Sequence, residues 1–316
     1  MGLPQTGKET KGYVAIVLAS ILFGTMGILA KLAFQYAISP ATLIALRLTV
    51  SSTTLFIILA MFRRGSLKIR KTDALAFLFF GVFAVAFQRI TYFYAIDLTT
   101  ATVAAMLFYT YPVFVILSAS LIQKKEKITT LQVGAIALTF LGVALVVKIY
   151  DFSQLKVSFW GIVFGILSSI LFAVYFLMTG RLRRTYSNLT LTLFGDGIGA
   201  LVLMPVIASD LSQISQFPAQ LWLIVLAIGW IPSLLAYSLF SYALKYVKAS
   251  RGTMLNVLEP VATAVLSATV IGEAFENLQI IGAVLALEGV LLLFRTGKTF
   301  PSDKAAFQHM PTSNVL

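Results

Sequence analysis

A short run of polar residues interrupts the apolar stretch around Glu259. At helical spacing Asn256, Glu259 and Thr263 fall on one face, and Gly252 and Ser267 extend that face at its two ends. Lipid cannot solvate such a stripe, so we expect it to line an internal cavity. There Glu259 and Asn256 have the chemistry to bind an amine, and the carboxyl group has the chemistry to carry a proton. The same residues also fit a structural acid that hydrogen-bonds to a neighbouring helix.

Five further charged residues lie within apolar segments: Lys31, Arg47, Arg89, Asp196 and Glu288. An ionised group at the centre of a membrane helix costs about 2.5–3.5 kcal/mol, so such groups find partners or serve function. We expect Arg47 and Arg89 to attract the anionic end of a ligand, and Asp196 to be a second candidate for carrying a coupling proton. An internal salt bridge is the alternative for Arg47 and Asp196. Lys31 is expected to snorkel to the headgroups and Glu288 to lie at a helix interface.

Aromatic side chains supply the walls of the expected cavity. They are Tyr92, Tyr109, Tyr111, Tyr175, Trp230 and Tyr237. Apolar ring faces with polar tips suit a small amphipathic metabolite. Plain packing is the alternative for any one of them, because aromatic residues are common in membrane bundles. Pro112 and Pro260 each remove one backbone hydrogen bond from an apolar helix, and we expect both to act as flex points.

These residues belong to a duplicated unit. Shifting the sequence by 148 positions places Tyr94–Pro112 on Tyr242–Pro260, with Tyr, Ala, Met, Leu and Pro repeated at matching positions. A shift of 149 positions places Arg47 on Asp196. The chain therefore consists of two related halves.

The composition is that of an all-α integral membrane protein. Of 316 residues, 59% are hydrophobic and 11% are charged, and the mean hydropathy is +0.93. Cysteine is absent, and the only histidine, His309, lies in a polar tail. Metal centres built on thiolate or imidazole and Ser/His or Cys/His catalysis are therefore not expected, and we predict no metal and no cofactor.

Ten segments are apolar for about the 20 residues that cross the hydrocarbon core. They span residues 13–36, 41–62, 74–95, 99–122, 131–147, 159–179, 189–208, 221–244, 252–271 and 278–294. Most of the 24 Lys and Arg residues fall in alternate loops, which predicts a multi-pass protein of the cell membrane with both termini in the cytoplasm. The net charge of +12 is thus a topology signal and does not indicate a nucleic-acid partner.

Five spans in each half force the two halves to insert in opposite directions. We therefore expect ten transmembrane helices in two inverted five-helix repeats. The first repeat is expected at 13–149 and the second at 157–295, between a cytoplasmic segment at 1–12 and a cytoplasmic tail at 296–316. Inverted repeats are a hallmark of secondary transporters, which bind their cargo near the membrane midplane between the halves.

Two longer segments carry a family resemblance: TTATVAAMLFYTYPVFVILSASLIQKKEKIT in the first half and KASRGTMLNVLEPVATAVLSATVIGEAFENLQIIGAVLALEGVLLL in the second. Together with Arg47 they resemble the EamA type of the drug/metabolite transporter superfamily, over about residues 13–295. The resemblance implies ten helices, inverted repeats, cytoplasmic termini, a central cavity and small-molecule transport, commonly export of amino acids or related metabolites. The Glu-Pro pair at 259 and 260 and the Gly-Glu pair at 272 and 273 match the family pattern, whereas Glu288 departs from it.

Our leading hypothesis is a secondary transporter that exports a small polar or zwitterionic metabolite, such as an amino acid, by alternating access. Its expected partners are that metabolite and membrane lipids, with the proton as the candidate coupling ion and no nucleic acid. Both a monomer and a homodimer stay open as the assembly. An intramembrane enzyme acting on a lipid or isoprenoid is the alternative from another class, and a sensor with a degenerate transporter fold is the third.

Overall fold

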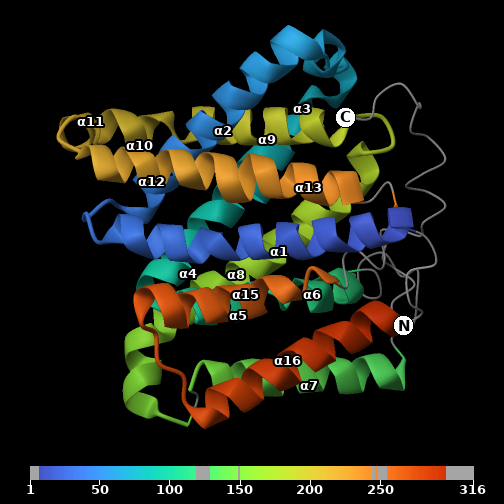
Figure 1. Cartoon of the computed structure of the whole chain (residues 1–316), viewed down its shortest axis with the longest axis vertical. Helices are drawn as coiled ribbons and strands as arrows, with labels where there is room; N and C mark the ends of the chain where they lie inside the picture. The colour runs from blue at the N-terminus through green and yellow to red at the C-terminus, as the bar shows by residue number, and fades with distance from the viewer. Residues whose placement is uncertain (1–6, 119–128, 149, 244–245, 248–254, 297–316) are drawn as a thin grey trace.

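The computed structural model describes residues 7–118, 129–148, 150–243, 246–247 and 255–296. Within these ranges the chain is helical and contains no strand, which confirms the expected all-α class. The helices lie side by side in one bundle, and Figure 1 shows most of them running along the same direction. The first helix, α1, begins and the last, α16, ends at the same end of this bundle (Figure 1).

Five helices are long and apolar enough to cross a membrane. They are α1 (Gly7–Phe34), α2 (Pro40–Phe62), the run Lys71–Leu98, the Phe159–Leu182 part of α8 (Phe152–Leu182) and the run Ala219–Ala243. The run Lys71–Leu98 joins α3 (Ala74–Phe79) to α4 (Gln88–Leu98) through a π-helical stretch at Phe80–Phe87. The run Ala219–Ala243 joins α12 (Ala219–Trp230) to α13 (Ala236–Ala243) through a π-helical turn at Ile231–Leu235.

Five shorter apolar helices fill the other positions expected from the sequence. They are Ala101–Leu117, made of α5 (Ala101–Phe108) and α6 (Tyr111–Leu117), then α7 (Thr130–Val146), α9 (Asn188–Val202), Leu258–Ile271, made of α15 (Leu258–Leu266) and a π-helical end (Ser267–Ile271), and most of α16 (Asn277–Thr296). Short helices α10 (Met204–Ser209) and α11 (Leu211–Ile214) and 3₁₀ turns at Arg64–Leu67 and Lys71–Asp73 complete the described elements. A two-repeat architecture fits this order of elements.

One helix is interrupted where the sequence predicts continuity. The expected segment covers 189–208, whereas α9 ends at Val202 and α10 begins at Met204. Pro205 stands in the first turn of α10, where the missing N–H is tolerated. The proline therefore starts a new helix instead of continuing the old one.

Hydroxyl side chains fix several helix starts. Ser39, Thr100 and Ser187 cap α2, α5 and α9, and each accepts a hydrogen bond from the backbone N–H three residues further on. Thr129 and Gln132 form a reciprocal capping box at the start of α7.

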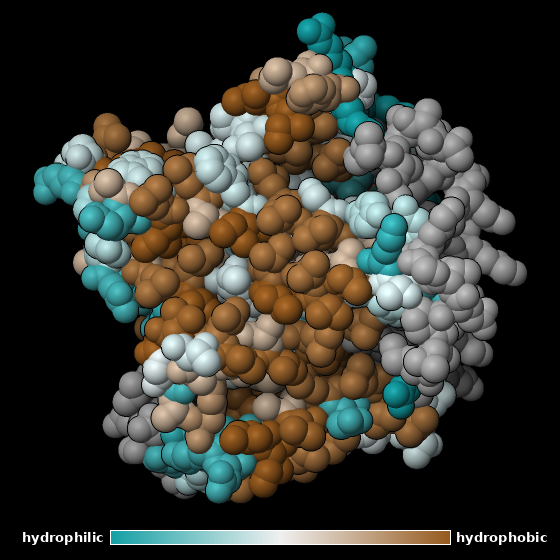
Figure 2. Space-filling view, in the orientation of Figure 1, coloured by the Kyte–Doolittle hydropathy of each residue, from teal (hydrophilic) through white to brown (hydrophobic). Residues whose placement is uncertain are grey.

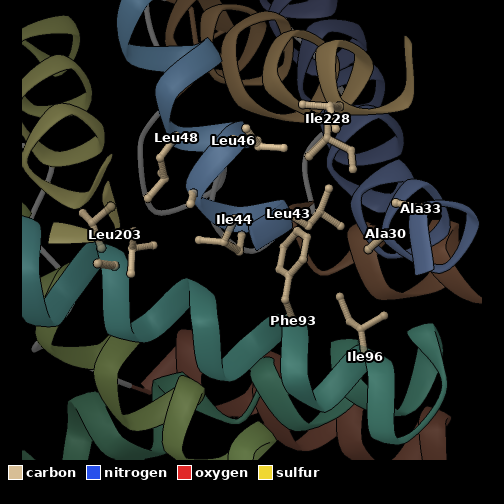
Figure 3. Close-up of a cluster of buried hydrophobic side chains, with 14 of the residues drawn as sticks. Ala30, Ala33, Leu43, Ile44, Leu46, Leu48, Phe93, Ile96, Leu203 and Ile228 are labelled. Atoms are coloured by element: carbon tan, nitrogen blue, oxygen red, sulfur yellow. The ribbon is translucent and has the colours of Figure 1, made fainter. Parts of the chain in front are cut away.

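The largest apolar core holds α2 against α4 and α12. Phe93 of α4 points toward Leu43 of α2, with Ile44 beside them and Ile228 of α12 on the other side (Figure 3). Phe93, Leu43, Ile44 and Ile228 are all fully buried. This packing fixes the register of α2 and α4, the two helices that carry Arg47 and Arg89.

The outer surface is strongly apolar. Leu75, Phe62 and Met61 are 77%, 76% and 69% exposed. Figure 2 shows hydrophobic side chains covering most of the middle of one face, with hydrophilic groups gathered toward its ends. Such a surface suits hydrocarbon and would be unusual on a soluble protein.

The helices α7 and α16 form a tight pair at the edge of the bundle (Figure 1). Glycines permit this approach, since a Cβ atom added to Gly142 would lie 2.3 Å from the backbone nitrogen of Ala286, and Gly282 and Gly289 are equally close to α7. Glu288 lies on α16 and is exposed. The expectation that its side chain lies at a helix interface is therefore wrong.

Replacing Gly142 by Ala should weaken the fold, because the new methyl group meets the backbone of α16. We expect a loss of about 1–3 kcal/mol in the free energy of unfolding, seen as a lower melting temperature in detergent. The matched control is Gly134→Ala on the same helix, where a Cβ meets nothing within 4 Å. There we expect no loss, since Ala favours a helix over Gly. Equal destabilisation by the two variants would contradict the close crossing of α7 and α16.

Candidate functional site

Two interrupted helices meet at their interruptions. The first repeat breaks at Tyr109 and Thr110, between α5 and α6, and the second turns at Asn256 and Val257 just before α15. Under the 148-position repeat the two breaks are equivalent to within one residue. Interrupted helices expose backbone carbonyl groups to binding, and transporters use them for this purpose.

Pro260 creates a hydrogen-bond acceptor at the second break. Because it has no N–H, it cannot bond to the carbonyl oxygen of Asn256 four residues earlier. The hydroxyl oxygen of Tyr109 lies 2.7 Å from that carbonyl oxygen and 2.8 Å from Oε2 of Glu259, within donating distance of both. Pro112 occupies the first turn of α6 in the same way. Both prolines thus stand at the breaks, where a flex point would act.

Asn256 completes the surroundings of the acid. Its Nδ2 atom donates to Oε2 of Glu259 at 3.2 Å and to the Tyr109 hydroxyl at 2.9 Å. Ser20 of α1 donates to Oδ1 of Asn256 at 3.1 Å. The hydrogen-bond partners of Glu259 are therefore neutral, and no ion pair in the described part of the chain includes it.

The rest of the polar stripe faces α1. The hydroxyl of Thr263 donates to the carbonyl oxygen of Glu259 at 3.0 Å and lies 3.3 Å from that of Gly24. Gly24 makes this approach possible, because a Cβ there would lie 3.0 Å from the Thr263 backbone nitrogen. Ser267 is buried, and Gly252 lies outside the described residues. Much of the stripe is therefore covered by α1.

A second buried cluster joins α2, α4 and α9. Nη2 of Arg89 lies 3.2 Å from Oδ1 of Asp196, and Ser51 donates to the other carboxylate oxygen at 2.7 Å. Asp196 is 2% exposed, so the two charges neutralise each other away from water. Ser51 is not among the residues that the sequence analysis selected, although its spacing of four from Arg47 places both on one face of α2.

Arg47 has no carboxylate within ion-pair distance, although Asp196 lies within electrostatic reach of it. It is 3% exposed, and its Nε donates to the hydroxyl of Ser233 at 3.1 Å. Pro232 frees the carbonyl oxygen of Ile228, to which the Ser233 hydroxyl donates at 2.9 Å, so the oxygen of Ser233 is available as an acceptor for Arg47. The guanidinium carbon also lies 6.0 Å from the ring centre of Phe93. Among the described residues no ion pair includes Arg47.

Tyrosines connect the two clusters. Tyr92 and Tyr237 each lie within electrostatic reach of both Arg47 and Glu259. Tyr175 lies in the same way near the Arg89–Asp196 pair. The structure thus gathers these three tyrosines, which the sequence analysis selected, around one group of charges.

A wall of aromatic rings flanks this group. Phe172 of α8 stacks on Tyr175 at 5.1 Å between ring centres, and it meets Tyr111 edge-on at 4.8 Å. Phe108 lies 4.6 Å from Phe172 and 5.1 Å from Tyr92. Phe108 is a site neighbour that sequence reasoning missed, because it looks like one more apolar residue of α5.

Two polar residues lie elsewhere than expected. Trp230 is 46% exposed, and its indole N–H donates to Thr54 at 3.1 Å, so the structure does not bring it to the clusters. Lys31 bonds to the chain itself. Its ammonium group donates to the carbonyl oxygen of Thr99 at 2.6 Å and to that of Asp97 at 3.3 Å.

Replacing one member of the Arg89–Asp196 pair should destabilise the protein more than replacing both members. We expect Arg89→Met and Asp196→Leu, each alone, to lower the free energy of unfolding by about 3–5 kcal/mol, because each leaves one buried charge uncompensated. The double variant should cost less than either single variant, as measured by melting temperature in one detergent. Losses that simply add would show that the two side chains are not coupled.

Comparison with known proteins shows which family the chain resembles. A family model described as the EamA-like transporter family matches residues 10–148 and 159–295. An "uncharacterized transporter" of Archaeoglobus fulgidus is 31% identical over 205 residues, which cover 65% of this chain and 71% of that protein. The "uncharacterized inner membrane transporter YicL" of Salmonella typhimurium is 25% identical over 297 residues, covering 91% and 96% of the two chains.

Two more distant similarities complete the picture. A protein of Streptantibioticus cattleyicolor, named "probable terminal-alkyne amino-acid exporter", is 23% identical over 195 residues, covering 62% of this chain and 64% of that one. A solved structure titled "Crystal structure of protein" superposes with a TM-score of 0.60 at 18% identity, covering 90% of this chain and 96% of the other, which supports the fold alone.

The family model matches once in each half and spans most of the chain, and relatives that match over nearly the full length are named transporters. The family match confirms the resemblance that the sequence analysis drew from the two segments around the helix breaks. The chain belongs to the EamA-like transporter family of the drug/metabolite transporter superfamily.

Proposed function

We propose that this protein is a secondary transporter that exports a small zwitterionic metabolite of the amino-acid type by alternating access. One observation carries the proposal. Arg47 and Glu259 carry groups of opposite charge that both lie within electrostatic reach of Tyr92 and Tyr237, and no ion pair among the described residues includes either of them. A ligand with a carboxylate at one end and an ammonium group at the other would neutralise both.

A zwitterion suits this arrangement because it brings one charge for each site. Its carboxylate would accept paired N–H groups from Arg47. Its ammonium group would donate to the carboxylate of Glu259 and to the carbonyl oxygen of Asn256. A ligand with a single charge would pair with only one of Arg47 and Glu259, and the other buried charge would stay without a partner, at a cost of several kcal/mol. The side chain of the cargo would lie along the rings of Phe172 and Tyr175.

Two further findings support the cargo class and the direction. One relative carries the name of an amino-acid exporter. Membership of a transporter family favours transport over an intramembrane enzyme. Glu259 is the first candidate for a coupling proton and Asp196 the second, although the ion pair with Arg89 already occupies Asp196.

For the architecture we propose ten spans in two inverted repeats, in the cell membrane, with both termini in the cytoplasm. The duplicated sequence and the equivalent helix breaks support the repeats. The common end of the bundle at which α1 begins and α16 ends supports an even number of crossings (Figure 1). Rocking of the repeats about the breaks would open the charge clusters to one side at a time.

The turn between α4 and α5 carries a contact between the two repeats that such a motion would have to break. Lys31 donates to the carbonyl oxygens of Thr99 and Asp97 at the end of α4. Glu273, from the second repeat, accepts from the backbone N–H of Ala101 at 3.2 Å, at the start of α5. Each charge complements the dipole of the helix end that it touches. The Lys31 contacts would hold this turn within the first repeat, and the Glu273 contact would hold the outer end closed and separate when the cargo leaves.

The cargo assignment is tested with three ligands that share one side chain: leucine, its decarboxylated amine and its deaminated acid. Binding is read from the shift in melting temperature of the purified protein, after a panel of amino acids has shown which side chain binds best. We expect the amino acid to bind about tenfold to hundredfold more tightly than either singly charged analogue, since each charge-assisted contact contributes about 1.5–3 kcal/mol. Equal binding of the amine and the amino acid would contradict the role of Arg47.

Two variants divide this effect between the ends of the ligand. Arg47→Gln should bind the amino acid no better than the amine, and Glu259→Gln no better than the acid. Arg181→Gln, which removes an exposed charge at the end of α8, is the matched control and should leave the preference unchanged. A uniform loss of affinity for all three ligands in Arg47→Gln would indicate a structural role instead.

The closing contacts are tested by labelling from outside the cell. The chain has no cysteine, so Ser20→Cys introduces a single reporter next to Asn256. We expect Glu273→Gln to raise the rate at which an impermeant maleimide reaches this cysteine several-fold, because the amide weakens the contact with the start of α5. Glu288→Gln, which changes an exposed acid on α16, is the control. Identical labelling rates in both backgrounds would rule out a closing role for Glu273.

A further inference from the structure

An apolar groove lies between α15 and α16, on the side of the molecule away from the charge clusters. Val261 and Val265 of α15 form one wall, Ile280 and Val284 of α16 form the other, and Met106 of α5 lies at the floor. Val265 is 57% exposed and Val284 55% exposed, so the groove is open to the surroundings of the bundle. In a membrane-spanning protein those surroundings are hydrocarbon.

The groove has the length of part of an acyl chain. The apolar part of its lining on α16 runs from Ile280 to Leu287, a rise of about 10 Å at 1.5 Å per residue. This is about a third of the hydrocarbon core, which is about 30 Å thick. A single lipid tail therefore fits along it, whereas a headgroup has no polar partner inside it except Thr102 and Gln279.

Gln279 marks the polar end of the groove. Its Nε2 donates to the carbonyl oxygen of Val146 at 3.0 Å, and its Oε1 accepts from the backbone N–H of Glu276 at 3.2 Å. These bonds tie the end of α7 to the start of α16. Lys148 lies two residues after Val146, and Glu276 lies three residues before Gln279. Both charged residues therefore stand beside the mouth of the groove.

Those residues form a compact pair of opposite charges. Lys148 donates to Oε1 of Glu276 at 2.7 Å, and the hydroxyl of Tyr150 donates to Oε2 at 2.9 Å. The hydrogen bonds from Lys148 and Tyr150 keep the pKa of Glu276 below its usual value, so the carboxylate stays ionised. The side chain of Glu276 is 54% exposed and that of Lys148 24% exposed, so both are open to a further partner.

We propose that this groove binds one acyl chain of an amine-bearing phospholipid of the phosphatidylethanolamine type. The phosphate lies against Lys148, whose ammonium group has N–H donors beyond the one bonded to Glu276, and the ammonium group of the lipid donates to Glu276. A zwitterionic headgroup matches a rim that carries one charge of each sign, whereas an anionic headgroup would oppose the carboxylate. The inference rests on the membrane placement of the family and not on the identity of the cargo.

The position of the groove gives the lipid a consequence for transport. Val261, Ala264 and Val265 lie on the face of α15 opposite to Glu259 and Thr263. A tail between α15 and the α7–α16 pair therefore fills the seam along which α15 would move. Loss of the tail would leave this seam open to a different packing of the helix that carries the central acid.

The test is native mass spectrometry of the intact protein, purified in mild detergent and mixed with equal amounts of phosphatidylethanolamine, phosphatidylcholine and phosphatidylglycerol. We expect one phosphatidylethanolamine molecule to be retained in preference to the other two. Ala283→Phe fills the groove from α16 and should reduce retention at least tenfold, and Ala264→Phe should do the same from α15. The matched control is Ala137→Phe on the exposed face of α7, which should retain the lipid.

Separate outcomes bear on the two parts of the proposal. Retention that is equal in Ala283→Phe, Ala264→Phe and Ala137→Phe, with unchanged melting temperatures, would overturn the groove as the lipid site. Glu276→Gln should abolish the preference for phosphatidylethanolamine over phosphatidylcholine while keeping the tail bound. Equal retention of the three headgroups by the unmodified protein would overturn the assignment of the rim.

Discussion

A buried charge in a membrane protein must be neutralised or used, and this constraint organises the centre of the molecule. Four charges meet there on α2, α4, α9 and α15. Arg89 and Asp196 neutralise each other at 3.2 Å, which leaves Arg47 and Glu259 with neutral hydrogen-bond partners in the described structure. This difference is the basis for our proposal that Arg89 and Asp196 form a structural pair and that Arg47 and Glu259 receive a ligand.

Backbone chemistry places the two unpaired charges. Pro260 cannot donate to the carbonyl oxygen of Asn256, which accepts from the backbone N–H of Glu259 at 2.9 Å and lies 2.7 Å from the Tyr109 hydroxyl. Pro232 releases a carbonyl oxygen that orients Ser233, and Ser233 in turn accepts from Arg47. Both charges therefore lie at irregular stretches of helix, where a proline lacks the N–H that would bond to the carbonyl group four residues earlier. In the proposed mechanism, a change of helix conformation at either proline would move the charged group next to it and so couple the motion to binding.

Much of this could be predicted from local sequence pattern. The duplication located the equivalent breaks, and helical spacing placed Asn256, Glu259 and Thr263 on one face, because both signals depend on nearby residues only. The pairing of Arg89 with Asp196 could not be predicted, since it depends on how α4 and α9 pack, and no local pattern encodes that register. The prediction that Trp230 lines the site was wrong for the same reason. The direction of its side chain depends on the π-helical turn that follows it.

The central claim is that one ligand satisfies both unpaired charges. The most direct measurement is uptake into proteoliposomes of labelled amino acids, polyamines, sugars and nucleosides, with and without an imposed pH gradient. The account predicts that amino acids alone are transported, and that the gradient drives their accumulation if Glu259 carries the coupling proton. Transport of polyamines, sugars or nucleosides without any amino acid would contradict a site that reads a carboxylate and an ammonium group together.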